Sequence, residues 1–369
     1  MSFISAKEMS EYHRSLFLKP KLQSANAYHI EPSQNYIKLD QNELPFDWPD
    51  DLKNKVLKSL KEKQWNRYPE PYSLELEKLV ANYAGINEKN ILLSPGSNYH
   101  ITVVINMLMR VNKNAKLVIA NPSFPLYEGH CLYEGIEFER WELDKNFQYD
   151  LKKLPELPRG SVLIFASPNN PTGSFLPKND LKSLLNQYPD VFFVADEAYY
   201  EFSSEPYTDL LKDHSNLLIL RTFSKAFCAA GVRLAYTAGS QVFIDNLRKL
   251  TLPFLLNYFS LVAMKHALKH KKFLYSLRSY VYFIIEERKK LYKALGENSL
   301  KFAYKVYPSS ANFLLLTWQD ETKYNNFFQD LKRSGVLVRP VFCSSACFAL
   351  RISIGREEEN KVVHDYLSR

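Results

Sequence analysis

Glycine is scarce in this chain, with 11 residues among 369, and it forms neither a Walker nor a dinucleotide-binding pattern. The four cysteines form no CxxC motif, and a chain of this length needs no disulfides for stability, so we expect reduced thiols. Long apolar runs are also missing. The most apolar stretch, Leu250–Met264, is broken by Pro253 and Asn257 and is too short to span a bilayer. The first 13 residues lack the apolar centre of a signal peptide. These absences predict a soluble, cytoplasmic protein without a membrane partner.

The charge balance gives little reason to expect a nucleic-acid partner. The net charge is +8, but lysine and arginine are spread along the chain, and the densest run is only Lys269–Lys272. We interpret that run as a solvated helix face, and the modest excess of cations suits anionic cofactors and substrates. Hydrophobic residues make up 46% of the chain, which is enough for a sizeable core.

Strand and helix patterns alternate through the middle of the chain, which predicts an α/β fold with a mostly parallel sheet covered on both faces. Helical patterns occupy Ser97–Arg110 and Lys178–Tyr188. The apolar runs that read as buried strands are Asn90–Leu93, Lys116–Ala120, Ser161–Ala166, Val191–Ala195, Leu217–Leu220 and Leu234–Ala238. In such sheets ligands bind beyond the carboxyl ends of the strands.

The pattern changes after about residue 265. A long helix is expected over His270–Leu295, and strands over Lys301–Val306, Asn312–Thr317 and Phe348–Ile354, with helices between and after them. We therefore expect two domains. Residues 46–265 would form the large one, and residues 1–45, as a returning arm, would join residues 266–369 in a smaller α+β domain.

A lysine follows one of the expected strands. The run Leu217–Lys225 is an apolar strand that ends in a polar turn with Ser224 and then Lys225. Burial at the mouth of a sheet lowers a lysine pKa and frees the amine to form a Schiff base. Taken alone, the same pattern also describes an ordinary surface lysine.

Another expected strand ends in Asp196, with Tyr199 three residues later. A buried carboxylate needs a cationic partner or several donors. The pyridinium nitrogen of pyridoxal 5'-phosphate (PLP) is such a partner, and an aspartate there maintains the ring as an electron sink. Tyr199 would then reach the phenolic oxygen of the ring. The alternative is an aspartate that caps the following helix.

Two loops complete this pattern. Ser167–Gly173 follows a strand and contains two prolines, two asparagines and a glycine, so it forms a rigid turn from which Asn170 would offer an amide to the phenolic oxygen. The turn before the helix at Ser97 places backbone N–H groups where an anion is favoured. Its cofactor-binding candidates, with two residues from the lysine loop, are Gly96, Ser97, Asn98, Ser224 and Arg233. Either loop could also be a tight turn without a ligand.

With these residues in place, the sequence resembles the fold-type I, class I/II aminotransferases, and among them the histidinol-phosphate aminotransferase family. The resemblance covers about residues 28–356. The matching segments keep the family's order: Leu39–Pro45, Arg67–Pro69, Pro122–Phe124, Asn169–Gly173, Asp196–Tyr199, Ser224–Phe227 with Ala230–Arg233, Val338–Pro340 and Leu350–Gly355.

The resemblance implies a role for each matching residue. Lys225 would be the Schiff-base lysine and proton shuttle, and it forms the catalytic set with Asp196 and Tyr199. Phe124 would stack on the cofactor ring, and Tyr68 would reach the phosphate bound by the neighbouring subunit of a homodimer. The substrate-binding candidates are Tyr28, Asn42, Arg339 and Arg351, of which Arg351 would bind the carboxylate of the amino donor and Arg339 the far end of the substrate.

The sequence departs from the family at four places. Asn98-Tyr99 replaces the usual phosphate-site acid, Cys228 and Ala27 replace a common glycine and a common proline, and Arg356 stands where a threonine is common. These changes spare the cofactor residues but leave the substrate open.

The expected function is transfer of an amino group between glutamate or 2-oxoglutarate and an amine or amino acid, in histidine biosynthesis. The alternatives are an aromatic amino-acid aminotransferase, and a threonine-phosphate decarboxylase-like or C–S lyase enzyme with the same cofactor residues. A PLP-sensing regulator module would need a DNA-binding domain, for which the chain has no room before Leu39. We expect no metal site, although His266 and His270 are spaced like zinc ligands on one helix.

Overall fold

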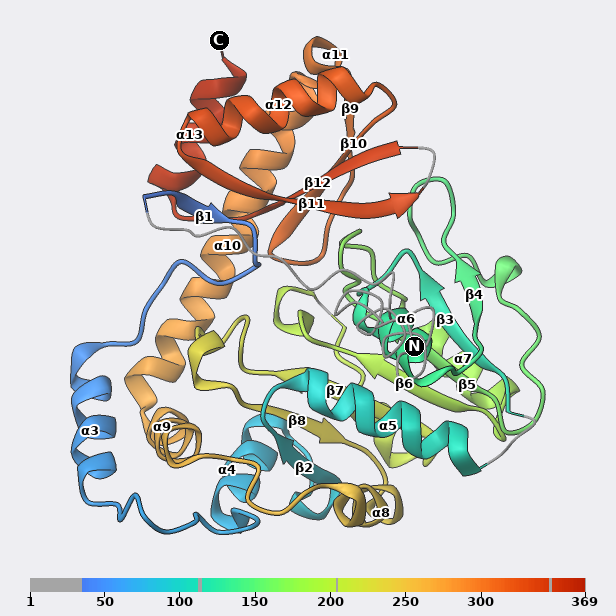
Figure 1. Cartoon of the computed structure of the whole chain (residues 1–369), viewed down its shortest axis with the longest axis vertical. Coiled ribbons are helices and arrows are strands. Elements are labelled where there is room, and N and C mark those ends of the chain that lie inside the picture. The colour runs from blue at the N-terminus through green and yellow to red at the C-terminus, as the bar shows by residue number, and fades with distance from the viewer. Residues whose placement is uncertain (1–34, 112–114, 204, 345–346, 369) are drawn as a thin grey trace, which may run out of the picture.

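The computed structural model describes residues 35–111, 115–203, 205–344 and 347–368. Figure 1 shows two sheets, one above the other, with the long helix α10 (Lys271–Glu297) running beside both. The larger sheet has seven strands in the order β2-β8-β7-β6-β5-β3-β4. Its strands are β2 (Ile91–Ser94), β3 (Leu117–Asn121), β4 (Glu139–Glu142), β5 (Val162–Ala166), β6 (Phe192–Asp196), β7 (Leu217–Thr222) and β8 (Ala235–Ala238).

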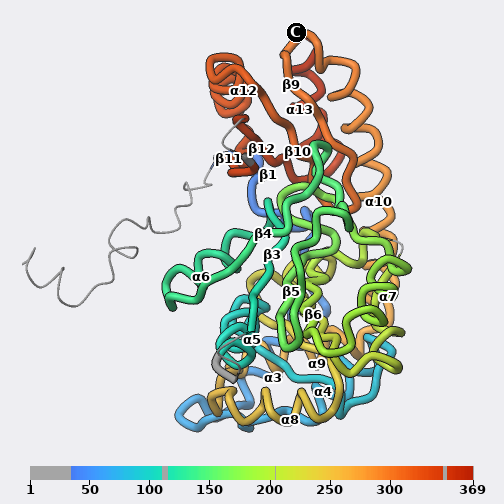
Figure 2. The backbone as a smooth tube through the Cα atoms, turned by 90° about the vertical axis from the view of Figure 1, so that its right-hand side faces the viewer, coloured from blue at the N-terminus to red at the C-terminus, as the bar shows by residue number. Residues whose placement is uncertain are grey.

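This sheet is parallel from β4 to β7, whereas β8 runs antiparallel to both β7 and β2. Helices pack on both of its faces, which is why its central strands are continuous apolar runs. One face packs against α3 (Asp50–Lys61), α4 (Leu74–Ala84), α7 (Lys178–Gln187) and α9 (Tyr258–Lys269). The other packs against α5 (Ser97–Val111), α6 (Leu126–Glu134) and α8 (Gln241–Leu250). In the turned view of Figure 2, α6 projects from the sheet beside β3 and β4.

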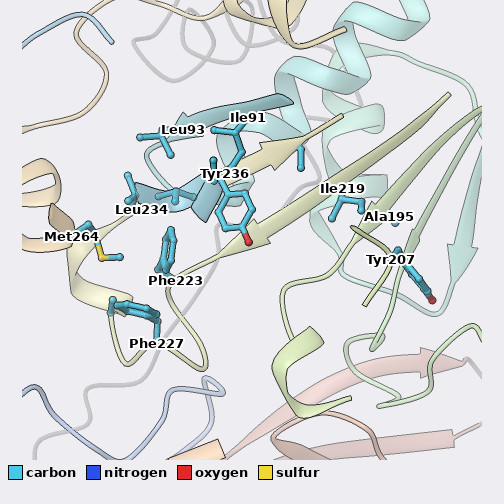
Figure 3. Close-up of a cluster of buried hydrophobic side chains, with 14 of the residues drawn as sticks. Ile91, Leu93, Ala195, Tyr207, Ile219, Phe223, Phe227, Leu234, Tyr236 and Met264 are labelled. Atoms are coloured by element: carbon cyan, nitrogen blue, oxygen red, sulfur yellow. The ribbon is translucent and has the colours of Figure 1, made fainter. Parts of the chain in front are cut away.

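Aromatic side chains fill the core beneath β7 and β8. Phe223 and Phe227 make an edge-to-face contact with ring centroids 5.0 Å apart, and Phe223 also lies 5.6 Å from Tyr236. Figure 3 shows these rings packed beside Leu93, Leu234 and Met264. Because Phe223 and Phe227 flank Ser224 and Lys225 in the chain, this packing fixes both ends of the lysine loop.

The smaller sheet has the order β1-β11-β12-β10-β9. Its strands are β1 (Ile37–Leu39), β9 (Tyr304–Val306), β10 (Phe313–Trp318), β11 (Val336–Ser344) and β12 (Cys347–Ser353), and its helices besides α10 are α11 (Ser299–Phe302), α12 (Glu321–Arg333) and α13 (Glu357–Leu367). Strand β1 joins it in parallel with β11. Short 3₁₀ helices are η1 (Glu88–Asn90), η2 (Leu151–Lys153), η3 (Tyr200–Phe202), η4 (Thr208–Lys212) and η5 (Ala230–Val232).

The α/β fold with a mostly parallel sheet is confirmed, and the six strands expected in the middle of the chain are β2, β3 and β5 to β8. Two expectations were wrong. Lys301–Val306 begins as helix α11 and only its end is strand β9, and His266 and His270 share no helix because α9 ends at Lys269. The domain boundaries at residues 45/46 and 265/266 remain a prediction. None of the helices described here is long and apolar enough to cross a membrane.

Candidate active site

A cavity of about 200 Å³ opens where β5, β6 and β7 end. Parallel strands place their carboxyl ends at one edge of the sheet, so Ala166, Asp196 and Thr222 meet there. The lining comes from both sheets and their loops: Gln41, Asn42, Ser97, Asn98, Phe124, Tyr127, Ala166, Pro168, Asn170, Asp196, Ala198, Tyr199, Thr222, Ser224, Lys225, Arg233 and Arg351. Segments from residue 41 to residue 351 thus build one site.

The Lys225 amine lies in this cavity and donates a hydrogen bond of 2.9 Å to the backbone oxygen of Gln41. Burial lowers the pKa of Lys225 to about 7, and the nearby cations Arg351 and Arg233 lower the pKa in the same direction. A lysine with this pKa carries a large share of free amine near neutral pH, which is the nucleophilic form.

The Asp196 carboxylate is buried at the end of β6 with a donor on each oxygen. The Tyr127 hydroxyl donates to Oδ2 at 2.6 Å, and the Ala198 N–H donates to Oδ1 at 3.0 Å. Burial raises the pKa of Asp196 to about 6, while these two hydrogen bonds lower it. The bond from Ala198 is a turn contact and not a helix cap, since the 3₁₀ helix η3 that follows has Tyr199 as its N-cap residue and no side-chain cap.

Tyr127 was missed in the sequence, although it lies one helical turn after Phe124. The two rings meet edge to face with centroids 5.7 Å apart, and both line the cavity. The spacing from Phe124, which precedes α6, gives no sign of the partner Asp196, 69 residues further along the chain. Gln41 and Thr222 were also missed. Gln41 contributes a backbone oxygen, for which side-chain patterns give no signal.

Two amides orient the polar groups on the opposite wall. Asn42 Nδ2 donates to the Tyr199 hydroxyl at 2.9 Å, and Ser353 Oγ donates to Asn42 Oδ1 at 2.9 Å. Arg351 Nη1 donates to Asn170 Oδ1 at 2.6 Å, and Nη2 donates to the Asp40 backbone oxygen at 2.7 Å. Because its oxygen accepts from Arg351, Asn170 presents its N–H₂ group as the remaining donor.

At the other end of the cavity, Ser97 and Asn98 begin α5, and Arg233 Nη1 donates to Ser224 Oγ at 3.2 Å. Gly96 does not line the cavity but lies directly behind this guanidinium. A Cβ built at Gly96 would collide with Arg233, and Gly96 also has a positive φ of 91°. Only glycine permits this close approach of backbone and guanidinium. A helix N-terminus, two hydroxyls and an arginine form an anion-binding end.

Two of the sequence candidates, Tyr68 and Arg339, lie elsewhere, and a third cannot be placed. Tyr28 is outside the described residues. Tyr68 is 78% exposed, stacks on Phe254 with ring centroids 4.6 Å apart, and does not line the cavity of its own chain. Arg339 lies directly opposite Arg351 in the β11–β12 register but is not among the lining residues.

Together, the polar side chains of the cavity match the functional groups of PLP. The buried carboxylate of Asp196 can balance a pyridinium, the Asn170 and Tyr199 donors can meet a phenolic oxygen, and the end beside Arg233 can hold a phosphate. Lys225 supplies the amine that an aldehyde requires.

Comparisons with known proteins agree with this chemistry. The chain matches the family described as aminotransferase class I and II over residues 34–367. A histidinol-phosphate aminotransferase of Clostridium novyi is 32% identical over 336 residues, which cover 90% of this chain and 91% of that protein. The corresponding protein of Pyrococcus furiosus is 33% identical over 88% of this chain and 90% of its own length.

Solved structures give the same fold. The structure of a histidinol-phosphate aminotransferase from Sinorhizobium meliloti in complex with PLP has a TM-score of 0.79 at 20% identity, and covers 95% of this chain and 96% of its own. An aromatic aminotransferase from Pyrococcus horikoshii has a TM-score of 0.76 at 21% identity, and covers 95% of this chain and 97% of its own. The family match, the relatives and the cavity lead to one conclusion: this chain belongs to the class I and II aminotransferase family and is a PLP-dependent transaminase.

Proposed function

We propose that this transaminase moves an amino group between histidinol phosphate and 2-oxoglutarate. The name histidinol-phosphate aminotransferase gives the first of these substrates for its relatives. The observation that carries the proposal is the convergence of Lys225, Asp196 and Arg351 on one cavity. The three groups supply an amine, an anion for the cofactor ring and a fork-shaped cation for a carboxylate or phosphate.

In this proposal, each part of the cofactor is held by its own group of residues. Asp196 binds the pyridine nitrogen, Asn170 and Tyr199 bind the phenolic oxygen, and Phe124 packs on the ring. The phosphate is bound by Ser97, Asn98, Ser224 and Arg233, with Tyr68 from a second copy of the chain. When bound, PLP supplies the stabilisation of negative charge at the substrate's α-carbon.

Lys225 is then the base and acid of the reaction. Its neutral amine takes a proton from the α-carbon of the substrate, and the resulting ammonium group gives a proton back as the amino group is transferred. A pKa near 7 favours both steps, because the neutral and the charged form of the amine are both accessible at neutral pH. Arg351 is held in place by its hydrogen bonds to Asn170 and the Asp40 oxygen, so its guanidinium is oriented before the substrate carboxylate arrives.

The two substrates present different chemical groups to the arginines of the smaller sheet. Glutamate has an α-carboxylate, whereas histidinol phosphate carries a CH₂–O–phosphate group on the same carbon and an imidazole at its far end. Arg351 would bind the carboxylate of glutamate, and Arg339, its neighbour across β11 and β12, is the candidate for the far group. Because Arg339 does not line the cavity, its role remains a prediction from the sequence.

We also propose a homodimer, from the position of Tyr68. Its ring stacks on Phe254 outside its own cavity, and the two rings form an exposed apolar surface; Trp65, Leu74 and Leu252 are further exposed apolar side chains of the neighbouring chain segments. Such a surface on a protein of this size favours contact with a second copy, and a two-fold interface would bring Tyr68 of one chain toward the site of the other. The cytoplasmic location is a further prediction from the sequence, which cell fractionation tests.

Steady-state turnover with three amino donors tests the proposed substrate. Purified, PLP-saturated enzyme is incubated with 2-oxoglutarate and either histidinol phosphate, phenylalanine or threonine phosphate, and glutamate and carbon dioxide are measured. We expect the highest kcat/KM for glutamate formation from histidinol phosphate, with Lys225→Ala as the inactive control. A preference for phenylalanine would make the enzyme an aromatic aminotransferase, and carbon dioxide from threonine phosphate would make it a decarboxylase.

A further inference from the structure

A second cavity, of about 560 Å³, lies between the first half of α10 and the segments behind the active site. It has a size usual for a small-molecule pocket. Its lining is Tyr83, Glu201, Ala226, Lys271, Leu274, Tyr275, Leu277, Arg278 and Val281. None of these residues lines the active-site cavity, although Ala226 follows Lys225 and Glu201 lies two residues after Tyr199.

The inner end of this cavity contains a carboxyl group with an unmet hydrogen bond. Glu201 Oε2 is buried and has no hydrogen-bond partner among the described residues. Burial raises the pKa of Glu201 to about 8, Glu197 raises it further, and Arg221 and the Tyr200 hydroxyl lower it. At neutral pH the carboxyl group therefore holds its proton and can donate a hydrogen bond to a ligand.

The outer end contains two cationic side chains that make no ion pair within the described residues. Lys271 and Arg278 are exposed on α10, at its first residue and two turns into the helix, and no ion pair joins either of them to a carboxylate in the described ranges. The neighbouring cations differ: Lys265 and Lys269 both pair with Glu75. Lys271 also begins α10, where the helix dipole favours an anion.

Apolar side chains join the two ends. Leu274, Leu277, Val281 and Ala226 form the wall, and the ring of Tyr275 is 74% exposed at the opening. A planar apolar body would cover this surface, while its charged end would meet the cations at the mouth. A buried hydrogen-bond donor, an apolar wall and two exposed cations describe one class of ligand.

We propose that this cavity binds a small aromatic carboxylate that also carries a neutral hydrogen-bond acceptor, with the carboxylate at Lys271 and Arg278 and the acceptor at Glu201. The site is independent of the substrate assigned to the active site. It would hold a molecule against Ala226, directly behind the lysine loop.

The probe for the test is 4-acetylbenzoate, which has an aromatic ring between a carboxylate and a ketone. Its binding to the PLP-saturated enzyme is measured by ligand-observed NMR titration. We expect 4-acetylbenzamide, without the charge, and benzoate, without the ketone, to bind more weakly. No detectable binding of 4-acetylbenzoate would overturn the proposal.

Variants decide where the probe binds. Each exposed cation contributes little alone, so Lys271→Gln and Arg278→Gln are combined, and the Kd should rise about 10-fold. Lys289→Gln with Lys293→Gln removes the same charge from α10 away from the cavity and should leave the Kd unchanged. Arg351→Lys in the active site should also leave it unchanged. A Kd that responds to Arg351→Lys and not to the Lys271 and Arg278 pair would place the probe in the active site and overturn the proposal.

The hydrogen bond from Glu201 to the probe is tested separately, by the pH dependence of the Kd. Glu201 faces Tyr83, Tyr200, Arg221 and Glu197 on the protein side, and Lys271 and Arg278 across the cavity. Wild-type binding should weaken as the pH rises through about 8, because Glu201 then loses its proton and becomes an acceptor. Glu201→Gln keeps an N–H donor at every pH, so its Kd should stay constant from pH 7 to 9. The same pH dependence in both proteins would contradict the assigned contact.

Discussion

Arg351 and Asn170 are joined by a hydrogen bond of 2.6 Å that links strand β12 of the smaller sheet to the loop after β5 of the larger one. The guanidinium is thereby oriented by the same amide that offers its N–H₂ group to the cavity. A second bond, from Nη2 to the Asp40 backbone oxygen, fixes the other side of the fork. In the proposed roles, the side chain that binds the substrate, Arg351, and the one that binds the cofactor, Asn170, are therefore in direct contact.

Arg351→Lys should impair the two half-reactions unequally. Lysine keeps the charge but cannot bind a carboxylate and the Asn170 amide with one planar fork. Measured in single half-reactions, kcat/KM for glutamate should fall about 100-fold, the effect of losing a buried charged hydrogen bond. The fall for histidinol phosphate, which has no α-carboxylate, should be smaller. Equal losses would show that Arg351 only orders the pocket.

Tyr127→Phe should raise the pKa of Asp196 above its value of about 6, because the lost hydroxyl stabilises the ionised carboxylate. The ionised form is the one that binds a pyridinium, so the apoenzyme should bind PLP more weakly on the acid side. We expect roughly a 10-fold loss of affinity at pH 6 and a smaller loss at pH 8, measured by fluorescence titration. Tyr304→Phe removes a buried hydroxyl far from the site, bonded to the Leu295 oxygen, and should change neither value. A loss in Tyr127→Phe that does not vary with pH would exclude this role of the hydroxyl.

Gly96→Ala should weaken PLP binding through Arg233, since the added methyl group would displace the guanidinium from its place beside Ser224. We expect a loss of about 10-fold or more in affinity for the phosphate end. Gly85→Ala is the matched control, because Gly85 also has a positive φ, of 70°, but has open space around it. Both variants should lose about 1 kcal/mol of stability, and only Gly96→Ala should lose cofactor affinity. Equal affinities in the two variants would mean that Arg233 does not bind the phosphate.

The large sheet could be predicted because each central strand is buried on both faces and is therefore a continuous apolar run. The edge strand β4, Glu139–Glu142, gave no such signal, since Trp141 is its single buried residue. Strand β11 was missed for a related reason: Arg339 and Pro340 interrupt its apolar pattern.

The site residues also fall into those that a local sequence pattern predicts and those that it does not. Lys225, Asp196 and Asn170 follow recognisable strand ends, and the structure brings all three to one cavity. Tyr127 and the Gln41 carbonyl depend on tertiary contacts over long distances in the chain, namely 69 residues for Tyr127 to Asp196 and 184 for Lys225 to Gln41. No local pattern encodes such partners, so the sequence alone could not supply them.

Mixed dimers should test the sharing of sites between two copies. In the proposed homodimer, Tyr68→Phe should lower PLP affinity in both sites, whereas Lys225→Ala should remove the catalytic amine from both. After subunit exchange, each mixed dimer would carry one site with both residues intact, so activity at limiting PLP should partly return. Light scattering establishes the oligomeric state in parallel. A monomer at working concentration, or no gain of activity after exchange, would contradict the shared site.

The most direct test of the account is the location of the cofactor's covalent attachment. The PLP-saturated enzyme is reduced with borohydride, digested and mapped by mass spectrometry. Lys225 is the lysine whose amine burial and neighbouring cations bring to a pKa of about 7, inside the cavity that Asp196 and Arg233 also line. We expect the label on the peptide that contains Lys225, and no label at this position in Lys225→Ala. A label on any other lysine of the wild-type enzyme would contradict it.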